Sequence, residues 1–210
     1  TCNGVDIERF NRDNLDCSRI ERLKADLGLN RYSFIIGFTG RMVRDKGIIE
    51  LVNAFKCLQV NHQNIALLLV GMLEERDALP ENIVNEIKSN SSIIYTGYVE
   101  NATIEYYYAL MDIFILPSYR EGFPTSVLEA SAMKLPIITT RVTGCIDSII
   151  EGETGLFVEH NIESIVEAIE KLYKSKCLRK SFSTNGRRFV EMNFEQHIIW
   201  EEIEKLYHNG

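Results

Sequence analysis

The sequence predicts a doubly wound α/β domain with a parallel six-stranded sheet, of the Rossmann-like type. Short runs that are apolar throughout alternate with longer segments whose apolar residues recur at helical spacing. Strands of this kind indicate a parallel sheet that helices cover on both faces. The length of 210 residues fits one domain, and the hydrophobic content of 45% is ordinary for a globular protein.

The six predicted strands are short apolar runs that end in glycine, proline or polar residues. Pro117 is expected to stop the fourth of them, and Asn101 to cap the helix before it. The expected strands are residues 34–40, 65–71, 92–97, 112–118, 135–140 and 155–159. The expected helices are residues 48–59, 101–111, 125–134, 162–175, 178–191 and 195–207. Residues 1–15 are predicted to be the polar exit from a linker.

Composition excludes several functional classes. The net charge of −7 argues against a general grip on nucleic acid or on an anionic membrane. No apolar run approaches the roughly 20 residues that a membrane helix needs. The five scattered cysteines lack metal-binding spacing, which is typical of reduced thiols in a cytosolic protein. No histidine stands beside a credible nucleophile, so triad chemistry is disfavoured. The start at Thr1 suits a fragment of a longer chain.

A basic loop follows the first predicted strand, in the stretch GFTGRMVRDKGIIEL. Ligands of doubly wound sheets bind at the carboxyl ends of the strands, and this loop places Arg41 and Lys46 there. The stretch is neither GxGxxG nor a Walker loop. A guanidinium fork and a mobile ammonium suit two adjacent phosphates. The alternative, a solvated loop that happens to be basic, stays open on these residues alone.

The stretch REGFPTSVLEA follows the fourth predicted strand. Pro124 begins a helix whose free amides and dipole favour an anion. Glu121 precedes that helix and Glu129 lies about one turn inside it, and two carboxylates suit pairs of sugar hydroxyls. The alternative is that Glu129 lies on the surface and Glu121 only complements the helix dipole.

Two further strand ends are weaker candidates. Backbone groups near Tyr98 and Val99 could bracket a flat base, although an ordinary turn explains this stretch as well. Thr143 and Gly144 could line the mouth of a pocket, with Gly144 suited to a close backbone approach. The tyrosines at positions 106–108 are predicted to pack in a helix.

These motifs together carry a family resemblance. The ordered set NGVDIERF, GFTGRMVRDKGIIELVNAF, LLLVG, IIYTGYVEN, YYYALMDIFILPSYREGFPTSVLEASAMKLPIITTRVTG and IIEGETGLFVE closely resembles the carboxyl-terminal half of retaining glycosyltransferases of family four, which have the GT-B fold. The stretches GMLEERDALPE and SYREGFPTSVLEA look most like the subgroup that builds bacterial capsule, O-antigen and lipid-linked oligosaccharides. The resemblance runs over nearly the whole chain.

The resemblance implies a role for each matching residue. Two basic residues would contact the diphosphate of the donor. A carboxylate and two amides would contact the donor sugar, and amides of the helix would also contact the phosphates. The second carboxylate would contact the ribose. The backbone near Val99 would contact the base. The catalytic set implied is Arg41, Lys46 and Glu121, and the donor-binding set is Gly40, Val99, Gly122, Phe123, Ser126, Val127 and Glu129.

The resemblance also implies what surrounds the chain. Residues 1–210 would form the donor-binding domain, preceded by an absent acceptor domain on which the helix at 195–210 packs, leaving Trp200 partly exposed. The donor would be a nucleotide-diphosphate sugar, UDP-linked, with no cofactor and no metal. The acceptor would be a glycan or a lipid-linked glycan. The full enzyme is expected in the cytoplasm, with any membrane contact at its inner face made through the absent domain.

Alternatives to this interpretation remain. A GT-B epimerase, a sugar phosphorylase and a non-catalytic nucleotide-sugar binding module would share these motifs. A dinucleotide oxidoreductase is disfavoured because GxGxxG is absent. The chain alone is predicted to lack transferase activity.

Overall fold

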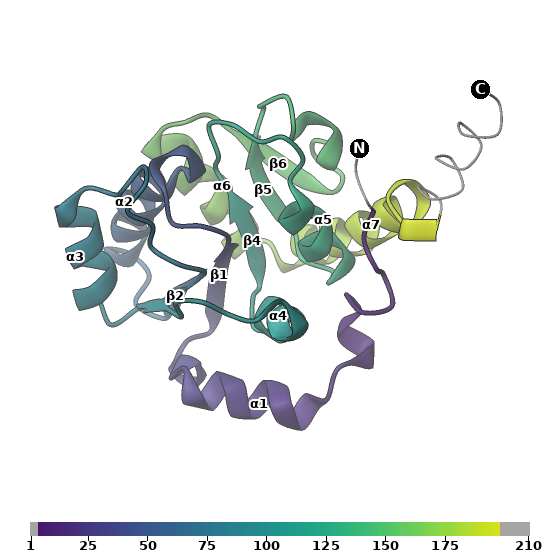
Figure 1. Ribbon diagram of the computed structural model, residues 1–210, viewed down its shortest axis with the longest axis horizontal. Helices are drawn as coiled ribbons and strands as arrows, with labels where there is room; N and C mark the ends of the chain where they lie inside the picture. The colour runs from purple at the N-terminus through teal and green to yellow at the C-terminus, as the bar shows by residue number, and fades with distance from the viewer. Residues whose placement is uncertain (1–3, 198–210) are drawn as a thin grey trace.

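A parallel sheet of six strands forms the centre of the computed structural model, which describes residues 4–197 (Figure 1). The order across the sheet is β3-β2-β1-β4-β5-β6, and every neighbouring pair is parallel. The predicted doubly wound parallel sheet is therefore confirmed. The strands are β1 (Phe34–Thr39), β2 (Ile65–Val70), β3 (Ile93–Tyr95), β4 (Ile113–Leu116), β5 (Ile137–Thr140) and β6 (Gly155–Val158).

Helices cover both faces of the sheet. On one face α2 packs against α3 and α6, and on the other α5 packs against α7 while α1 contacts α4. The helices are α1 (Cys17–Asp26), α2 (Ile48–Gln59), α3 (Glu81–Ser89), α4 (Ile104–Tyr108), α5 (Thr125–Ala132), α6 (Ile162–Lys174) and α7 (Lys176–Asn193). All residues of β1 and β2 are buried, because these central strands have helices on both sides.

Several predicted details are wrong. Helices α1 and α3 are absent from the prediction. Asn101 is expected to cap a helix, but it begins a short 3-10 turn instead. Thr103 precedes α4 without a side-chain capping bond. The third strand spans three residues rather than six. The opening segment packs on the domain, since Val5 and Phe10 are 2% and 4% exposed and Val5 pairs with Glu195; its role as the exit from a linker stays a prediction.

The helix predicted at 195–207, including Trp200, lies mostly outside the described residues.

The sheet changes winding direction between β1 and β4. The chain leaves β1 through α2 towards β2 and β3, then returns through α4 to place β4 on the other side of β1. Loops that follow β1 and β4 therefore diverge, which leaves a crevice at the carboxyl ends of these two strands. Both principal motifs of the sequence, the basic loop and the segment with two glutamates, belong to these loops.

Candidate functional site

A cleft with two adjoining hollows lies at this crevice. The hollows have volumes of about 360 and 370 Å³ and share Thr39, Gly40, Arg41 and Ile104. The first is polar, and its remaining lining residues are Lys46, Tyr108, Leu116, Glu121, Phe123, Pro124, Thr125, Ser126 and Glu129. The second is more apolar, with Val70, Gly71, Met72, Glu74, Tyr98 and Val99. The structure thus brings most of the predicted residues into one continuous cleft.

Lys46 and Glu121 meet in the polar hollow. Lys46 Nζ lies 2.5 Å from Glu121 Oε1, and the Ser118 hydroxyl donates to the same carboxylate oxygen at 2.7 Å. The side chains of Lys46 and Glu121 are only 20% and 9% exposed. This contact supports the prediction that these two residues share a site. A role for Glu121 only as a partner of the helix dipole would not explain the contact with Lys46.

Glu129 reaches the same hollow from α5 and is anchored by a tyrosine. The Tyr108 hydroxyl lies 2.8 Å from both Glu129 Oε2 and Thr39 Oγ1, and Tyr108 is fully buried. Burial raises the pKa of Glu129 above its ordinary value of 4.5, although the bond from Tyr108 and the charge of Arg9 act in the opposite direction. Burial, reinforced by the charge of Glu129, holds the pKa of Tyr108 well above 10.0, so the phenol stays a donor.

The raised pKa of Glu129 predicts that this carboxyl lowers the stability of the folded state at higher pH. In the folded state this carboxyl keeps its proton at pH values where the unfolded chain has released it, so its contribution to stability falls as pH rises from about 4.5 through the folded pKa. We expect Glu129→Gln to gain stability relative to the wild type with rising pH across this window. Thermal melts from pH 4.5 to 8 measure this, and a difference that stays flat or narrows would contradict it.

Arg41 adopts a more open position than Lys46. Its guanidinium forms an ion pair with Glu74 at 3.2 Å, and its side chain is 65% exposed. An exposed pair of this kind contributes little to stability, so a ligand can take over the guanidinium at small cost. Arg41 lines both hollows, at the place where they join.

The first turn of α5 offers fewer amides than predicted. The amides of Thr125 and Val127 donate to the carbonyls of Phe123 and Pro124, and Val127 is fully buried. In this turn of the described chain, the Ser126 amide is the one left without a backbone acceptor. Gly122 is exposed next to the polar hollow, and its neighbour Phe123 lines it.

The two weaker candidates also lie near the cleft. Tyr98, which is 72% exposed, and Val99 line the apolar hollow. A Cβ at Gly144 would come within 2.3 Å of the Glu121 carbonyl oxygen, so the predicted close backbone approach is confirmed. Gly144 thereby fixes the loop that carries Glu121.

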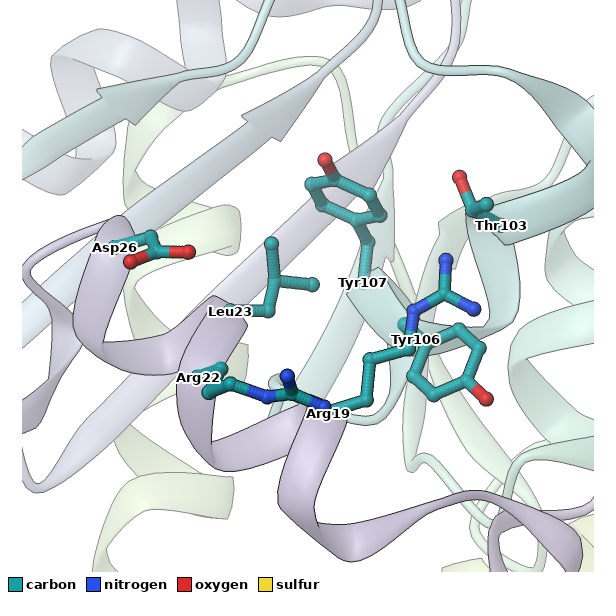
Figure 2. Close-up of a pocket in the computed structure, with 7 residues that line it drawn as sticks. All are labelled: Arg19, Arg22, Leu23, Asp26, Thr103, Tyr106 and Tyr107. Carbon is teal, nitrogen blue, oxygen red and sulfur yellow. The ribbon is translucent and has the colours of Figure 1, made fainter.

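A separate cavity of about 260 Å³ lies between α1 and α4 (Figure 2). Figure 2 shows Arg19 and Tyr106 side by side, and the guanidinium carbon lies 4.1 Å from the ring centre. None of its lining residues belongs to the loops directly after β1, β2 or β4. We therefore place the functional site at the cleft.

Sequence reasoning missed two residues that hold the carboxylates. Tyr108 is in the core as predicted for an inward-facing tyrosine, yet its hydroxyl also serves Glu129. Ser118 is fully buried and serves Glu121. A polar residue at the end of an apolar strand was the available signal for Ser118, whereas the partner of Tyr108 is twenty-one positions away.

No three His, Cys, Asp or Glu side chains within residues 4–197 gather closely enough to hold a metal ion. None of the helices in this range combines the length and apolar character that crossing a membrane requires.

Curated relatives share the whole length of this chain. It is 39% identical over 206 residues to the capsular polysaccharide biosynthesis glycosyltransferase CapM of Staphylococcus aureus, a match that covers 98% of this chain and 52% of CapM. It is 26% identical over 205 residues to N,N'-diacetylbacillosaminyl-diphospho-undecaprenol alpha-1,3-N-acetylgalactosaminyltransferase of Campylobacter jejuni, covering 97% of this chain and 52% of that enzyme. The chain thus spans about half the length of the curated relatives it matches.

Solved structures share the fold. A glycosyltransferase from Rickettsia africae superposes with a TM-score of 0.85 at 25% identity, covering 98% of this chain and 55% of that one. The C-terminal domain of a glycosyl transferase group 1 family protein (LpcC) from Francisella tularensis has a TM-score of 0.80 at 24% identity, with 91% of this chain and 99% of that one covered. The fold predicted from the resemblance, one half of a GT-B glycosyltransferase, is confirmed. Because the model of the family described as glycosyl transferases group 1 matches residues 19–189, the chain belongs to that family.

Proposed function

We propose that this chain is the nucleotide-sugar donor-binding half of a retaining glycosyltransferase that transfers a hexose-type sugar. The observation that carries the proposal is that Lys46, paired with Glu121, and the open guanidinium of Arg41 line one polar hollow that adjoins an apolar one. Two cations, two carboxylates and an adjoining apolar hollow match a diphosphate that joins a sugar to a nucleoside.

Each part of the donor has a partner in this proposal. Arg41, Lys46 and the Ser126 amide contact the diphosphate and stabilise the charge that develops as it leaves. Glu121, with the backbone of Gly122 and Phe123, contacts sugar hydroxyls. Positively charged side chains, rather than a metal ion or a cofactor, meet the leaving group. The acceptor hydroxyl then attacks from the face that the diphosphate leaves.

The nucleoside occupies the rest of the cleft. Glu129 accepts from the ribose hydroxyls, and the base lies in the hollow beside Gly40, Tyr98 and Val99. Val127 supports this turn by packing, because its amide is already used within α5. A fold neighbour, Alr3699/HepE of Anabaena, was solved in complex with UDP and glucose, which makes UDP the first nucleotide to test.

The acceptor follows from the named relatives. CapM takes its name from capsular polysaccharide, and the Campylobacter jejuni relative from a diphospho-undecaprenol acceptor. We propose a growing glycan or a lipid-linked oligosaccharide as the acceptor, bound by a further domain of the whole enzyme. The enzyme would then work in the cytoplasm, at the inner face of the membrane, and this chain alone would not transfer sugar.

A thermal-shift panel tests the proposal. Nucleotide sugars and free nucleotides are added to the chain, and we expect a UDP-sugar to raise the melting temperature because it binds only the folded state. Lys46→Ala and Glu129→Ala should lose this shift, while Lys88→Ala, at an exposed position of α3, should keep it. A shift that survives in both cleft variants would refute the site, and sugar release without an acceptor would favour an epimerase or a phosphorylase.

A further inference from the structure

The loop that carries Glu121 is held through Ser118, its second residue. The Ser118 hydroxyl donates to Glu121 Oε1, the oxygen that also contacts Lys46. Ser118 is fully buried, which restricts its side chain, so the backbone at this residue sets where the hydroxyl lies. The position of the Glu121 carboxylate therefore depends on what fixes the backbone at Ser118.

Two side chains from other segments fix that backbone. The Ser118 carbonyl oxygen accepts from Thr140 Oγ1 at 2.5 Å and from His160 Nε2 at 2.9 Å. Thr140 ends β5, and His160 lies between β6 and α6, directly before the capping residue of α6. A carbonyl oxygen only accepts, so Nε2 carries the hydrogen, and both lone pairs of the oxygen are used.

The ring of His160 is itself fixed from one side. It stacks on Tyr119 with ring centres 4.2 Å apart and planes 12° from parallel. The Tyr119 hydroxyl donates to Glu50 Oε1 at 2.8 Å, and its amide donates to the Asp45 carbonyl at 2.8 Å. The histidine thus connects the end of β6 to the loops that follow β1 and β4.

We propose that His160 is a positioning residue for Glu121 and, through it, for recognition of the donor sugar. This inference rests on the proposed function. His160 is not among the residues that line the cleft, so it acts through Ser118. Glu129 has its own anchor in Tyr108, which His160 does not touch. A change at His160 should consequently affect the sugar end of the donor and spare the nucleotide end.

The test compares two variants of this chain. His160→Phe keeps a ring against Tyr119 but removes the donor, and His160→Gln keeps a donor of similar reach without the ring. Isothermal titration gives Kd for UDP and for UDP-glucose. We expect His160→Phe to lower the preference for UDP-glucose over UDP by about 3- to 10-fold, the effect of one hydrogen bond, with the Kd for UDP unchanged. His160→Gln should restore most of the preference.

Two outcomes would overturn the inference. One is an equal loss of affinity for both ligands, or an unchanged preference, in His160→Phe. The other is a ligand-free crystal structure of the same variant that keeps the contact of 2.7 Å between Ser118 Oγ and Glu121 Oε1, which we expect to be lost. If the wild type binds neither probe, the proposed nucleotide is wrong, and this ligand-free structure still decides: an intact contact excludes a positioning role for His160.

Discussion

Lys46→Ala is expected to reduce sugar transfer by about 100- to 1,000-fold in the enzyme that contains this chain, the range seen when one charge-stabilising donor is removed from an active site. Lys46 is the cation held inside the polar hollow, against Glu121, whereas Arg41 stays mostly exposed. Loss of Lys46 also leaves the Glu121 carboxylate without its counter-charge. Steady-state rates with a saturating donor measure the effect on kcat.

Lys88→Ala is the matched control for this change. It removes the same side chain from an exposed position in α3, away from the cleft, and should leave the rate unchanged. A Lys46→Ala enzyme with kcat within about threefold of the wild type would assign the diphosphate to other residues.

Gly47→Ala is expected to give a large loss of stability. Gly47 has φ of 69°, a left-handed conformation that costs other residues about 1–2 kcal/mol. An added Cβ would also lie 2.1 Å from the Pro117 carbonyl oxygen, a backbone atom that cannot turn aside. The loops after β1 and β4 would have to separate, so we expect a loss of more than about 2 kcal/mol in the free energy of unfolding.

Gly28→Ala separates the two causes. Gly28 has nearly the same φ, 65°, but an added Cβ there would meet no atom within 4 Å. Its loss in urea unfolding reports the backbone conformation alone, and the excess loss at Gly47 reports the contact with Pro117. Equal losses for the two variants would show that the loops are not in close contact.

The framework of the fold was predictable because its signal is local. β1 and β2 are apolar at every position except Thr39, and α6 repeats apolar residues every three or four positions after a capping Asn161. Helix α1 escaped prediction because it has no fully buried residue, and its polar composition resembles a loop. Packing of the partly buried Ile20 and Leu23 against the core, rather than a local pattern, keeps this helix in place.

The site was predictable in its residues but not in its contacts. Strand-end loops identified Lys46 and Glu121, since the sheet brings the ends of parallel strands to one edge. The anchors of the carboxylates depend on residues far apart in the chain, such as Ser118 with His160, and spacing carries no signal for them. Which amides of α5 stay accessible likewise depends on which of them donate to the Pro124 carbonyl within the first turn.

In the structure, the Lys46 ammonium already neutralises the Glu121 carboxylate, so any ligand must compete with this ion pair. A free monosaccharide has no anionic group with which to draw Lys46 away, so it must compete for a carboxylate that is already neutralised. A diphosphate offers Lys46 a new partner and releases Glu121 at the same step. Under the proposed function, affinity for the sugar is then conditional on the nucleotide, and free hexose in a cell would compete poorly with the intact donor.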